Sequence, residues 1–305
     1  MEIRAKLRSW PTLVSFILAA FPVAMLIFIV VALIDESKIA IEYRGFSELL
    51  STEFSSRLAS TGFQKYVYGA LPALWGTLIL LLVTLAIALP VSLAWAIVAS
   101  EFSGSFLGRI LRGLLGVLAG IPPIVYAVIG IVFMRQLLII PNFSTLTGGL
   151  LLAMLAIPFM TPLIDDAIRN VPNHLKEGSL ALGATRWHTL QKVVLPAALP
   201  GIISAAGLGA LKSTGDIMIA IWAVGYAPSF PAPFWDILSH PAPLTATSAS
   251  FVGGASVTMV DTTPNTVGWI EYSVSYFYGI VLLILALFVM VLVTILQRIF
   301  KKRLS

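Results

Sequence analysis

Six long stretches without an acidic or basic side chain limit what this chain of 305 residues can fold into. A helix needs roughly 20 predominantly apolar residues to cross a bilayer, and each stretch, alone or with its continuation, supplies about that length. Trimmed for loops, the stretches predict spanning helices at residues 12–34, 71–98, 110–135, 146–166, 196–224 and 275–298. Only 11% of the residues are charged, against roughly 25% in a typical soluble domain. The sequence therefore predicts an all-α integral membrane protein with six transmembrane helices.

The distribution of lysine and arginine predicts how these helices are oriented. Thirteen of the 19 basic residues fall on the side of the predicted membrane that carries the N-terminus, five on the opposite side and one, Lys212, within a span. Basic loops remain on the cytoplasmic side, so we expect both termini in the cytoplasm. The first stretch resembles a signal peptide, but it is too long and lacks a clear cleavage site, so we expect it to be retained.

The loops divide the chain into three parts. Residues 1–70 are expected to form the first span and an outer loop, residues 71–300 the transport domain, and residues 301–305 a cytoplasmic tail. A second long outer loop, at residues 226–272, is rich in proline and aromatic residues and carries almost no charge. We expect part of it to lie in the interface or within the protein, with a plain exposed loop as the alternative.

Several kinds of catalytic site are absent from the sequence. The chain has no cysteine, and its three histidines, His174, His188 and His240, are scattered. No glycine-rich phosphate loop ending in Gly-Lys occurs, so the chain has no Walker-type ATP site. We expect no enzyme activity and no cofactor in this chain, with ATP and magnesium bound by a separate subunit.

The most informative segment is the predicted cytoplasmic loop at residues 165–196, between the fourth and fifth spans. Its pattern predicts two short amphipathic helices that are separated at Gly183. The motif reads Glu177-Gly-Ser, three residues, Gly183-Ala184, and then Val-Val-Leu195-Pro196 after a spacing of nine residues from the glycine. This spacing and these residue types resemble the EAA loop of ABC importer permeases, with Gly and Ser in place of the two alanines.

That resemblance implies a type I importer (MetI-like) permease fold, in which this loop docks on the ATPase. Glu177, Gly183, Ala184, Leu195 and Pro196 are then the expected coupling residues. Glu177 is expected either to hydrogen-bond within the turn or to pair with a basic residue of the partner. An ordinary surface helix pair that merely joins two spans is the alternative.

Two charged residues fall in the predicted fifth span, where Lys212 and Asp216 are four positions apart. On a continuous helix they would share one face. Charges at membrane depth are costly unless they are paired or face a cavity, so they mark functional sites. With the hydroxyls of Ser213 and Thr214, they are expected to line a path for an anion, and a structural ion pair is the alternative.

This stretch also resembles the permeases of phosphate-specific (Pst-type) importers. That family has Arg at the position of Lys212, Gly at Gly215, Glu at Asp216 and Met at Met218. Two further segments are similar, Ala-Gly-Ile-Pro-Pro-Ile-Val-Tyr at residues 119–126 and Leu-Thr-Ala-Thr at residues 244–247. The matches cover roughly residues 70–300 and are most like the "C" permease.

Within the first of these segments, Pro122 and Pro123 are expected to kink or break the third span. The preceding Gly120, together with Gly113 and Gly116, would permit close helix contact. A gating hinge and simple packing remain equal alternatives for these residues.

The resemblance implies an ATP-driven importer of inorganic phosphate in the cytoplasmic membrane that works by alternating access. Its expected partners are an "A"-type permease, two copies of an ATPase and an extracytoplasmic phosphate-binding protein, and no nucleic acid. The alternatives are an importer for another oxyanion or small solute and, from a different class, a secondary transporter or a membrane-embedded enzyme that uses Lys212 and Asp216 directly.

Overall fold

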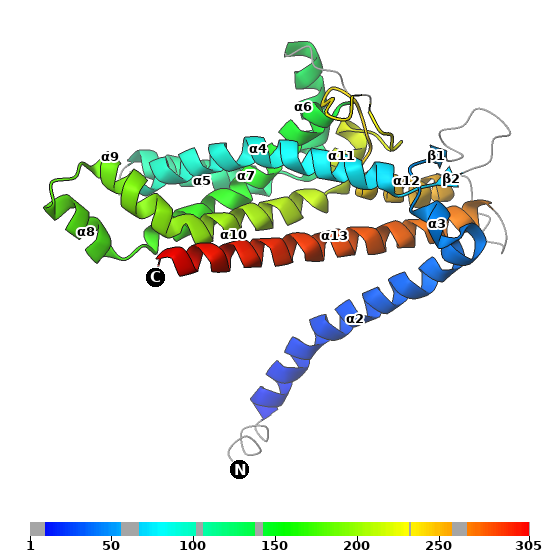
Figure 1. The fold of residues 1–305 in the computed structure, drawn as a ribbon, viewed down its shortest axis with the longest axis horizontal. Helices are drawn as coiled ribbons and strands as arrows, with labels where there is room; N and C mark the ends of the chain where they lie inside the picture. Colours follow the sequence, from blue (N-terminus) through cyan, green and yellow to red (C-terminus); the bar gives the residue numbers. More distant parts are fainter. Residues whose placement is uncertain are drawn as a thin grey trace.

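The computed structural model describes residues 10–55, 67–101, 106–137, 143–231, 233–257 and 267–304, and Figure 1 shows them as a helical bundle. Four long helices run side by side in it: α4 (Leu71–Glu101), α7 (Thr145–Arg169), α10 (Leu195–Thr214) and α13 (Val267–Leu304). A fifth, α2 (Trp10–Arg44), meets α13 at one end of the bundle and projects away from it. A bent pair, α5 (Phe106–Gly120) and α6 (Pro123–Leu137), lies between α4 and α7 in the sequence. Within these residues, five helices are long and apolar enough to cross a membrane, or six if the bent pair is one span. The prediction of an all-α, multi-pass membrane protein is confirmed.

Shorter elements occupy the two ends of the bundle. At one end lie α3 (Phe46–Leu49), the antiparallel pair β1 (Phe54–Ser55) and β2 (Val67–Tyr68), and α12 (Leu244–Val257). α11 (Ile217–Ala223) lies between α12 and α6 and contacts both. At the other end lie α8 (Asn173–Ala181), α9 (Arg186–Thr189) and the π-helix η1 (Leu190–Val194), close to the C-terminus. The predicted outer loop at residues 226–272 therefore contains a helix, and α12 is covered by protein because it packs on α4, α11 and α13.

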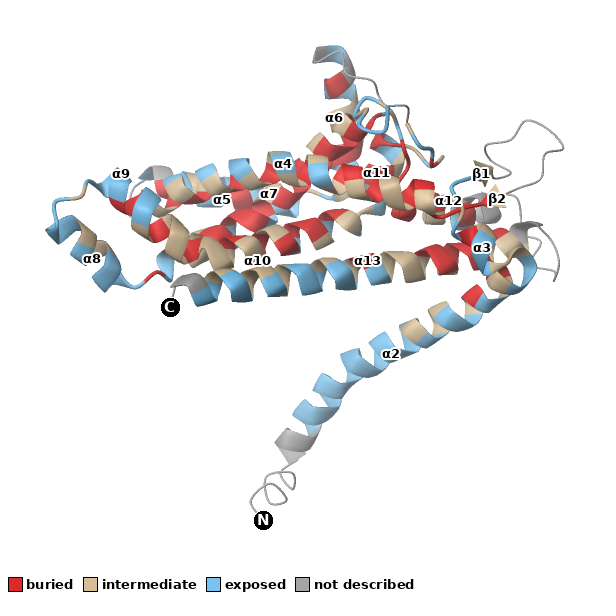
Figure 2. Cartoon of the chain, viewed as in Figure 1, coloured by how far each residue is buried: buried red, intermediate tan, exposed pale blue. Residues whose placement is uncertain are grey.

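The centre of the bundle is formed by α4, α7 and α10. Small side chains dominate this core, including the fully buried Ala88, Ala153 and Ala205. Gly209 of α10 lies directly against Met160 of α7, since a Cβ atom there would come within 2.4 Å of the Met160 sulfur. Small residues let membrane helices approach closely. The resulting van der Waals contacts stabilise helix packing in lipid, where the hydrophobic effect between helices is absent. Figure 2 shows this buried core and the mainly exposed surface of α2.

The third predicted span, at residues 110–135, consists of two helices, α5 and α6. The chain breaks at Ile121 and Pro122, and the two halves meet at 100°. Proline has no N–H to continue the ladder and disfavours helical geometry in the residue before it. The predicted break at the Pro122–Pro123 pair is therefore confirmed.

The three glycines that precede this bend do not pack within the chain. A Cβ atom added at Gly113, Gly116 or Gly120 would meet nothing within 4 Å in the described structure. Among the described residues these three glycines therefore pack against no other helix, and the gating hinge and packing against a partner both stay predictions.

The first and last spans are longer than predicted. The sequence places them at residues 12–34 and 275–298, but α2 continues to Arg44 and α13 covers 38 residues from Val267. The C-terminal end of α2 and the N-terminal end of α13 extend to a polar cluster at one end of the bundle. There the Tyr68 hydroxyl donates to the buried carboxylate of Glu271 at 3.2 Å, and the Tyr278 hydroxyl donates to the Gly69 carbonyl at 3.0 Å. The apolar stretches in the sequence correspond to the part of each helix that is long enough to cross a membrane. The residues beyond that part are helical because of these tertiary contacts.

Candidate translocation site and coupling loop

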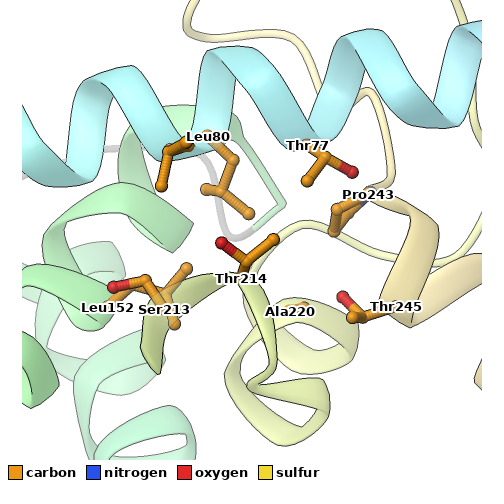
Figure 3. Close-up of a pocket in the computed structure, with 9 residues that line it drawn as sticks. Thr77, Leu80, Leu152, Ser213, Thr214, Ala220, Pro243 and Thr245 are labelled. Atoms are coloured by element: carbon orange, nitrogen blue, oxygen red, sulfur yellow. The ribbon is translucent and has the colours of Figure 1, made fainter. Parts of the chain in front are cut away.

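Two of the four predicted pathway residues, Ser213 and Thr214, line a small cavity of about 10 Å³ near the end of α10 (Figure 3). A space of that size holds about one water molecule. Helices α4, α7 and α11 and the start of α12 supply the other walls, with the residues Thr77, Leu80, Leu81, Leu152, Ala220, Pro243 and Thr245. Four of the nine lining side chains carry hydroxyl groups, which makes the site polar within an otherwise apolar bundle.

The hydroxyls on α10 are fixed by their own helix. Ser213 donates to the Gly209 carbonyl at 2.8 Å, and Thr214 donates to the Ala210 carbonyl at 2.6 Å. Each is the bond to the residue four positions earlier that Ser and Thr commonly form inside helices. Because the hydroxyl protons are engaged, the oxygens are left to act as hydrogen-bond acceptors.

A hydrogen bond closes the cavity between α4 and α12. The backbone N–H of Leu244 donates to the Thr77 hydroxyl oxygen at 2.9 Å, and that hydroxyl donates to the Ala73 carbonyl at 2.8 Å. Gly76 makes this approach possible, because a Cβ atom there would lie 2.5 Å from the Pro241 carbonyl oxygen. The start of α12 therefore rests directly on the backbone of α4.

Lys212 does not face this cavity. Its side chain is exposed on the surface of the isolated chain, and its Nζ atom lies 5.1 Å from the centre of the Phe159 ring on α7. A cation at that distance from an aromatic face is attracted by the ring's negative charge density. Among the described residues, no salt bridge joins Lys212 to an acidic group.

The prediction that Lys212 and Asp216 share a helix face is wrong. Helix α10 ends at Thr214, and Asp216 has extended backbone angles as the N-cap of α11. Its carboxylate accepts a hydrogen bond from the Ile219 N–H at 2.8 Å. The predicted span 196–224 is therefore two helices, because Gly215 disfavours helix continuation and Asp216 starts a new one.

The predicted cytoplasmic loop folds as a helix, a turn and a second helix. α8 ends at Ala181, with Leu182 as its C-cap, and Gly183 has φ +85°, a conformation that glycine adopts readily. The Gly183 N–H donates to the Leu180 carbonyl at 2.9 Å, and the Ala184 N–H donates to the Ser179 carbonyl at 3.2 Å. This pair of bonds forms a Schellman motif, so the prediction that Gly183 ends the helix is confirmed.

The outer surface of this loop is uncovered. No residue of α8 is buried, and the large apolar side chains Leu182 and Trp187 are 91% and 60% exposed. Glu177 is exposed and makes no hydrogen bond or salt bridge within the described part of the chain. The expected hydrogen bond within the turn is therefore absent there, and the carboxylate is left for another molecule.

The second helix of the loop runs directly into the membrane span. α9, η1 and α10 form one helical segment, Arg186–Thr214, of 29 residues. Thr185 caps its start by accepting the His188 N–H at 3.2 Å. Leu195 and Pro196, both half-buried, begin α10 directly after η1. The proline therefore lies within the continuous helical segment, where it has no N–H to donate to the preceding turn. Residues of the predicted cytoplasmic loop and residues that line the cavity therefore belong to one continuous helical segment.

Two residues of the cavity, Thr77 and Thr245, were missed as site residues at the sequence level. Thr245 lies in the Leu-Thr-Ala-Thr segment that resembles the phosphate-specific permeases, so its position carried a signal. Thr77 lies in an apolar helix and carries no signal in the sequence. Its role as the acceptor of the Leu244 N–H follows only from the packing of α12 on α4.

Comparison with known proteins places the chain among transport proteins. Residues 88–240 match the family described as "Binding-protein-dependent transport system inner membrane component". The chain is 33% identical over 165 residues to the probable ABC transporter permease protein YqgH of Bacillus subtilis, covering 52% of this chain and 53% of that protein. It is 27% identical over 230 residues to the phosphate transport system permease protein PstC of Xylella fastidiosa, covering 68% and 69%.

A further relative is the phosphate transport system permease protein PstA 1 of Mycobacterium tuberculosis, 30% identical over 219 residues, with 70% of this chain and 67% of that protein covered. The chain thus spans from about half to about two thirds of the length of these curated relatives. Among solved structures, a chain of a bacterial ABC transporter for import of the acidic polysaccharide alginate superimposes with a TM-score of 0.63. The identity is 16%, and 98% of this chain and 99% of the other are covered. This likeness bears on the fold alone.

Proposed function

Because the chain belongs to the binding-protein-dependent transport system inner membrane component family, we propose that it is the permease subunit of an ATP-driven importer of inorganic phosphate. The observation that supports phosphate as the solute is the similarity to proteins named phosphate transport system permeases, which extends over 219 to 230 residues. The chain itself carries out no bond chemistry. It supplies a path across the inner membrane, and a separate ATPase supplies the energy.

The exposed cation Lys212 supports an anionic solute. A charged side chain near the end of a membrane span is costly where it faces lipid, so it belongs at a protein interface or a water-filled path. Lys212 is exposed on the isolated chain, beside Phe159 of α7. If a second permease covers this surface, Lys212 faces the path between the two subunits, next to Ser213 and Thr214. Asp216 then maintains the bend between α10 and α11 through its capping bond.

The uncovered face of α8 and α9 supports docking of the ATPase. Glu177, Leu182 and Trp187 are exposed there, and Gly183 fixes the angle between the two helices. Two copies of the ATPase would each dock on one permease. ATP-driven closure of the pair would then move the docking helices and switch the path from outward- to inward-facing.

The remaining partners follow from the same proposal. The second permease is of the "A" type, since the chain resembles the "C" type, and an extracytoplasmic binding protein delivers phosphate to the outer end. An importer of another solute is the second candidate, because a permease with the same fold belongs to a transporter of alginate.

The test is uptake of radioactive phosphate into proteoliposomes that contain the chain with its second permease, ATPase and binding protein. We expect ATP-dependent uptake that unlabelled phosphate blocks and that alginate oligosaccharides do not affect. Lys212→Ala should reduce uptake by at least about tenfold, as for loss of a charge-assisted contact, and Lys212→Arg should retain most of it. Uptake without the ATPase would support a secondary transporter and reject the importer. If the Lys212→Ala importer takes up phosphate at the normal rate, Lys212 is not part of the transport path.

A further inference from the structure

A second pocket, of about 250 Å³, lies at the end of the bundle where α8 and α9 are found (Figure 1). One water molecule needs only about 10–15 Å³ of such space, so this pocket has room for a group of many atoms. Its walls are the ends of α4 and α7, one side of α8, and α9 with η1. The lining residues are Ser100, Ile168, Lys176, Leu180, Arg186, Thr189, Leu190 and Val194.

Two cations line this pocket. They are Lys176 of α8 and Arg186 of α9, and none of the described residues around the pocket is acidic. The Lys176 ammonium donates to the Ile168 carbonyl at 3.4 Å, which holds it beside the end of α7 and leaves two of its three N–H donors for another partner. Neither cation belongs to a salt bridge in the described part of the chain. A phosphate or carboxylate group is the partner that such donors bind most strongly.

The position of Arg186 adds to this argument. It is the first residue of the helical segment Arg186–Thr214, and a positive side chain is unfavourable at the N-terminal end of a helix because the helix dipole is positive there. Arg186 therefore does not stabilise the helix that it begins. A negatively charged group in the pocket would offset this cost.

The depth of the pocket matches the headgroup layer of a membrane. Ser100, Ile168 and Val194 each lie two residues outside a predicted span, which is about 3 Å along a helix. The polar layer on each side of the hydrocarbon core is roughly 5–8 Å thick. Three different helices therefore place the walls of the pocket at the level of the lipid phosphates.

The rest of the lining suits a ligand that is partly hydrocarbon. Half of the eight lining side chains are apolar. Lys176 and Leu180 are four positions apart on α8, so they share one helix face, and Leu180 is 43% exposed. A cation and an open apolar surface thus occur side by side. A small ion from water needs only the first of these, whereas an anionic lipid uses both.

We propose that this pocket binds the phosphate headgroup of an anionic membrane lipid, with Lys176 and Arg186 as its cationic ligands. Basic pockets between membrane helices bind anionic headgroups in this way. The bound lipid joins α8 of the coupling loop to the ends of α4 and α7 and holds it at the membrane surface. This inference goes beyond the proposed function, since it holds whichever solute the importer carries.

Lipid binding by the assembled importer tests the proposal. The chain is purified with its second permease and ATPase in detergent and stripped of lipid. Phosphatidylglycerol is then titrated, and native mass spectrometry counts the bound molecules. Phosphatidylcholine is the zwitterionic comparison, and inorganic phosphate is the soluble competitor.

The variant that removes the site is Lys176→Gln with Arg186→Gln, and Arg186→Lys is the conservative change. The matched control is Arg298→Gln with Lys301→Gln. It also removes one arginine and one lysine that are exposed near the same end of the bundle, but these residues do not line the pocket.

The unaltered complex should hold a phosphatidylglycerol molecule that phosphatidylcholine does not replace. Each cation should contribute about fivefold to its affinity, so the double variant should lose roughly 25-fold, while the control stays within about twofold. Arg186→Lys keeps the charge and should retain most of the affinity. Inorganic phosphate at the same concentration should leave the lipid bound.

Four results would overturn the proposal. They are unchanged lipid affinity in the double variant, an equal loss in the control, displacement of the lipid by an equal concentration of inorganic phosphate, and lipid binding that occurs only after the ATPase is removed. The last would assign the pocket to the docking interface. If the double variant does not assemble, Arg186→Gln alone, with its fivefold loss, decides between the same results. Failure of the unaltered complex to import phosphate would reject the proposed function and leave the lipid measurement valid.

Discussion

The backbone N–H of Leu244 donates to the hydroxyl oxygen of Thr77 at 2.9 Å, and this bond joins helices whose residues are 167 positions apart in the sequence. Both groups are buried. The bond satisfies the first N–H of α12, which has no partner within its own helix. It also sets how close α12 comes to α4, and so the size of the cavity between them.

Replacing Thr77 with valine should destabilise the protein by about 1–3 kcal/mol, because it leaves the buried Leu244 N–H without a partner. Valine keeps the shape and the β-branching of threonine, so packing changes little. The midpoint of thermal unfolding in detergent measures the effect. Thr84→Val is the control, since the Thr84 hydroxyl donates only to the Leu80 carbonyl of its own helix. Equal midpoints for the two variants would show that the bond between α4 and α12 contributes nothing.

Two glycines of the coupling loop should respond in opposite ways to alanine. Gly183 has φ +85°, where an L side chain costs about 1–2 kcal/mol, so Gly183→Ala should disturb the turn and reduce co-purification of the ATPase. Gly178 lies inside α8 with nothing within 4 Å of an added Cβ. Gly178→Ala should therefore stabilise α8 by up to about 1 kcal/mol and leave ATPase binding intact. A Gly183→Ala permease that binds the ATPase normally would contradict the assigned role of the turn.

Asp216 should tolerate asparagine and not alanine. The carboxylate caps α11 through the Ile219 N–H, and asparagine caps a helix about as well, whereas alanine loses about 1 kcal/mol. We expect Asp216→Asn to retain stability and phosphate uptake, and Asp216→Ala to lose stability. Thermal unfolding and uptake are measured together. If Asp216→Asn had normal stability but no uptake, the negative charge of Asp216 would be required for transport in addition to its capping hydrogen bond.

The contact between α7 and α10 should be intolerant of even one methyl group. A Cβ atom at Gly209 would lie within 2.4 Å of the Met160 sulfur, so Gly209→Ala forces repacking that costs about 1–3 kcal/mol. Gly113→Ala on α5 is the control, because an added Cβ there meets nothing within 4 Å. The midpoint of thermal unfolding of the isolated chain should fall for the first variant only. Loss of assembly with the second permease in Gly113→Ala would place that subunit on α5.

The fold was largely predictable because a membrane-spanning helix can be recognised from a long stretch of apolar residues. Apolar stretches of sufficient length predicted every long helix, and the pattern around Gly183 predicted the two short helices of the loop at residues 165–196. The turn at Gly183 was predictable for a local reason, since glycine adopts a positive φ readily. Local patterns of this kind depend on neighbours in the sequence, so they can be read without the fold.

The break between α10 and α11 was missed because a glycine is tolerated inside an apolar helix. The sequence nevertheless contains a signal for this break, because Asp216 precedes an apolar run and follows Gly215, which is typical of the start of a new helix. The cavity was not predictable in the same way. Thr77 and Thr245 meet across helices that are far apart in the sequence, and their roles follow from packing.

The unbroken helical segment Arg186–Thr214 has a consequence for energy conversion. Its 29 residues extend for about 40 Å at the usual helical rise. Trp187 near one end is exposed, and Ser213 and Thr214 at the other end line the cavity. The segment contains the π-helix η1 and, directly after it, Pro196, and helices bend at both kinds of feature. A displacement imposed at Trp187 is therefore divided between bending at these positions and movement of Ser213 and Thr214, so the stiffness of residues 190–196 sets how much of it reaches the cavity.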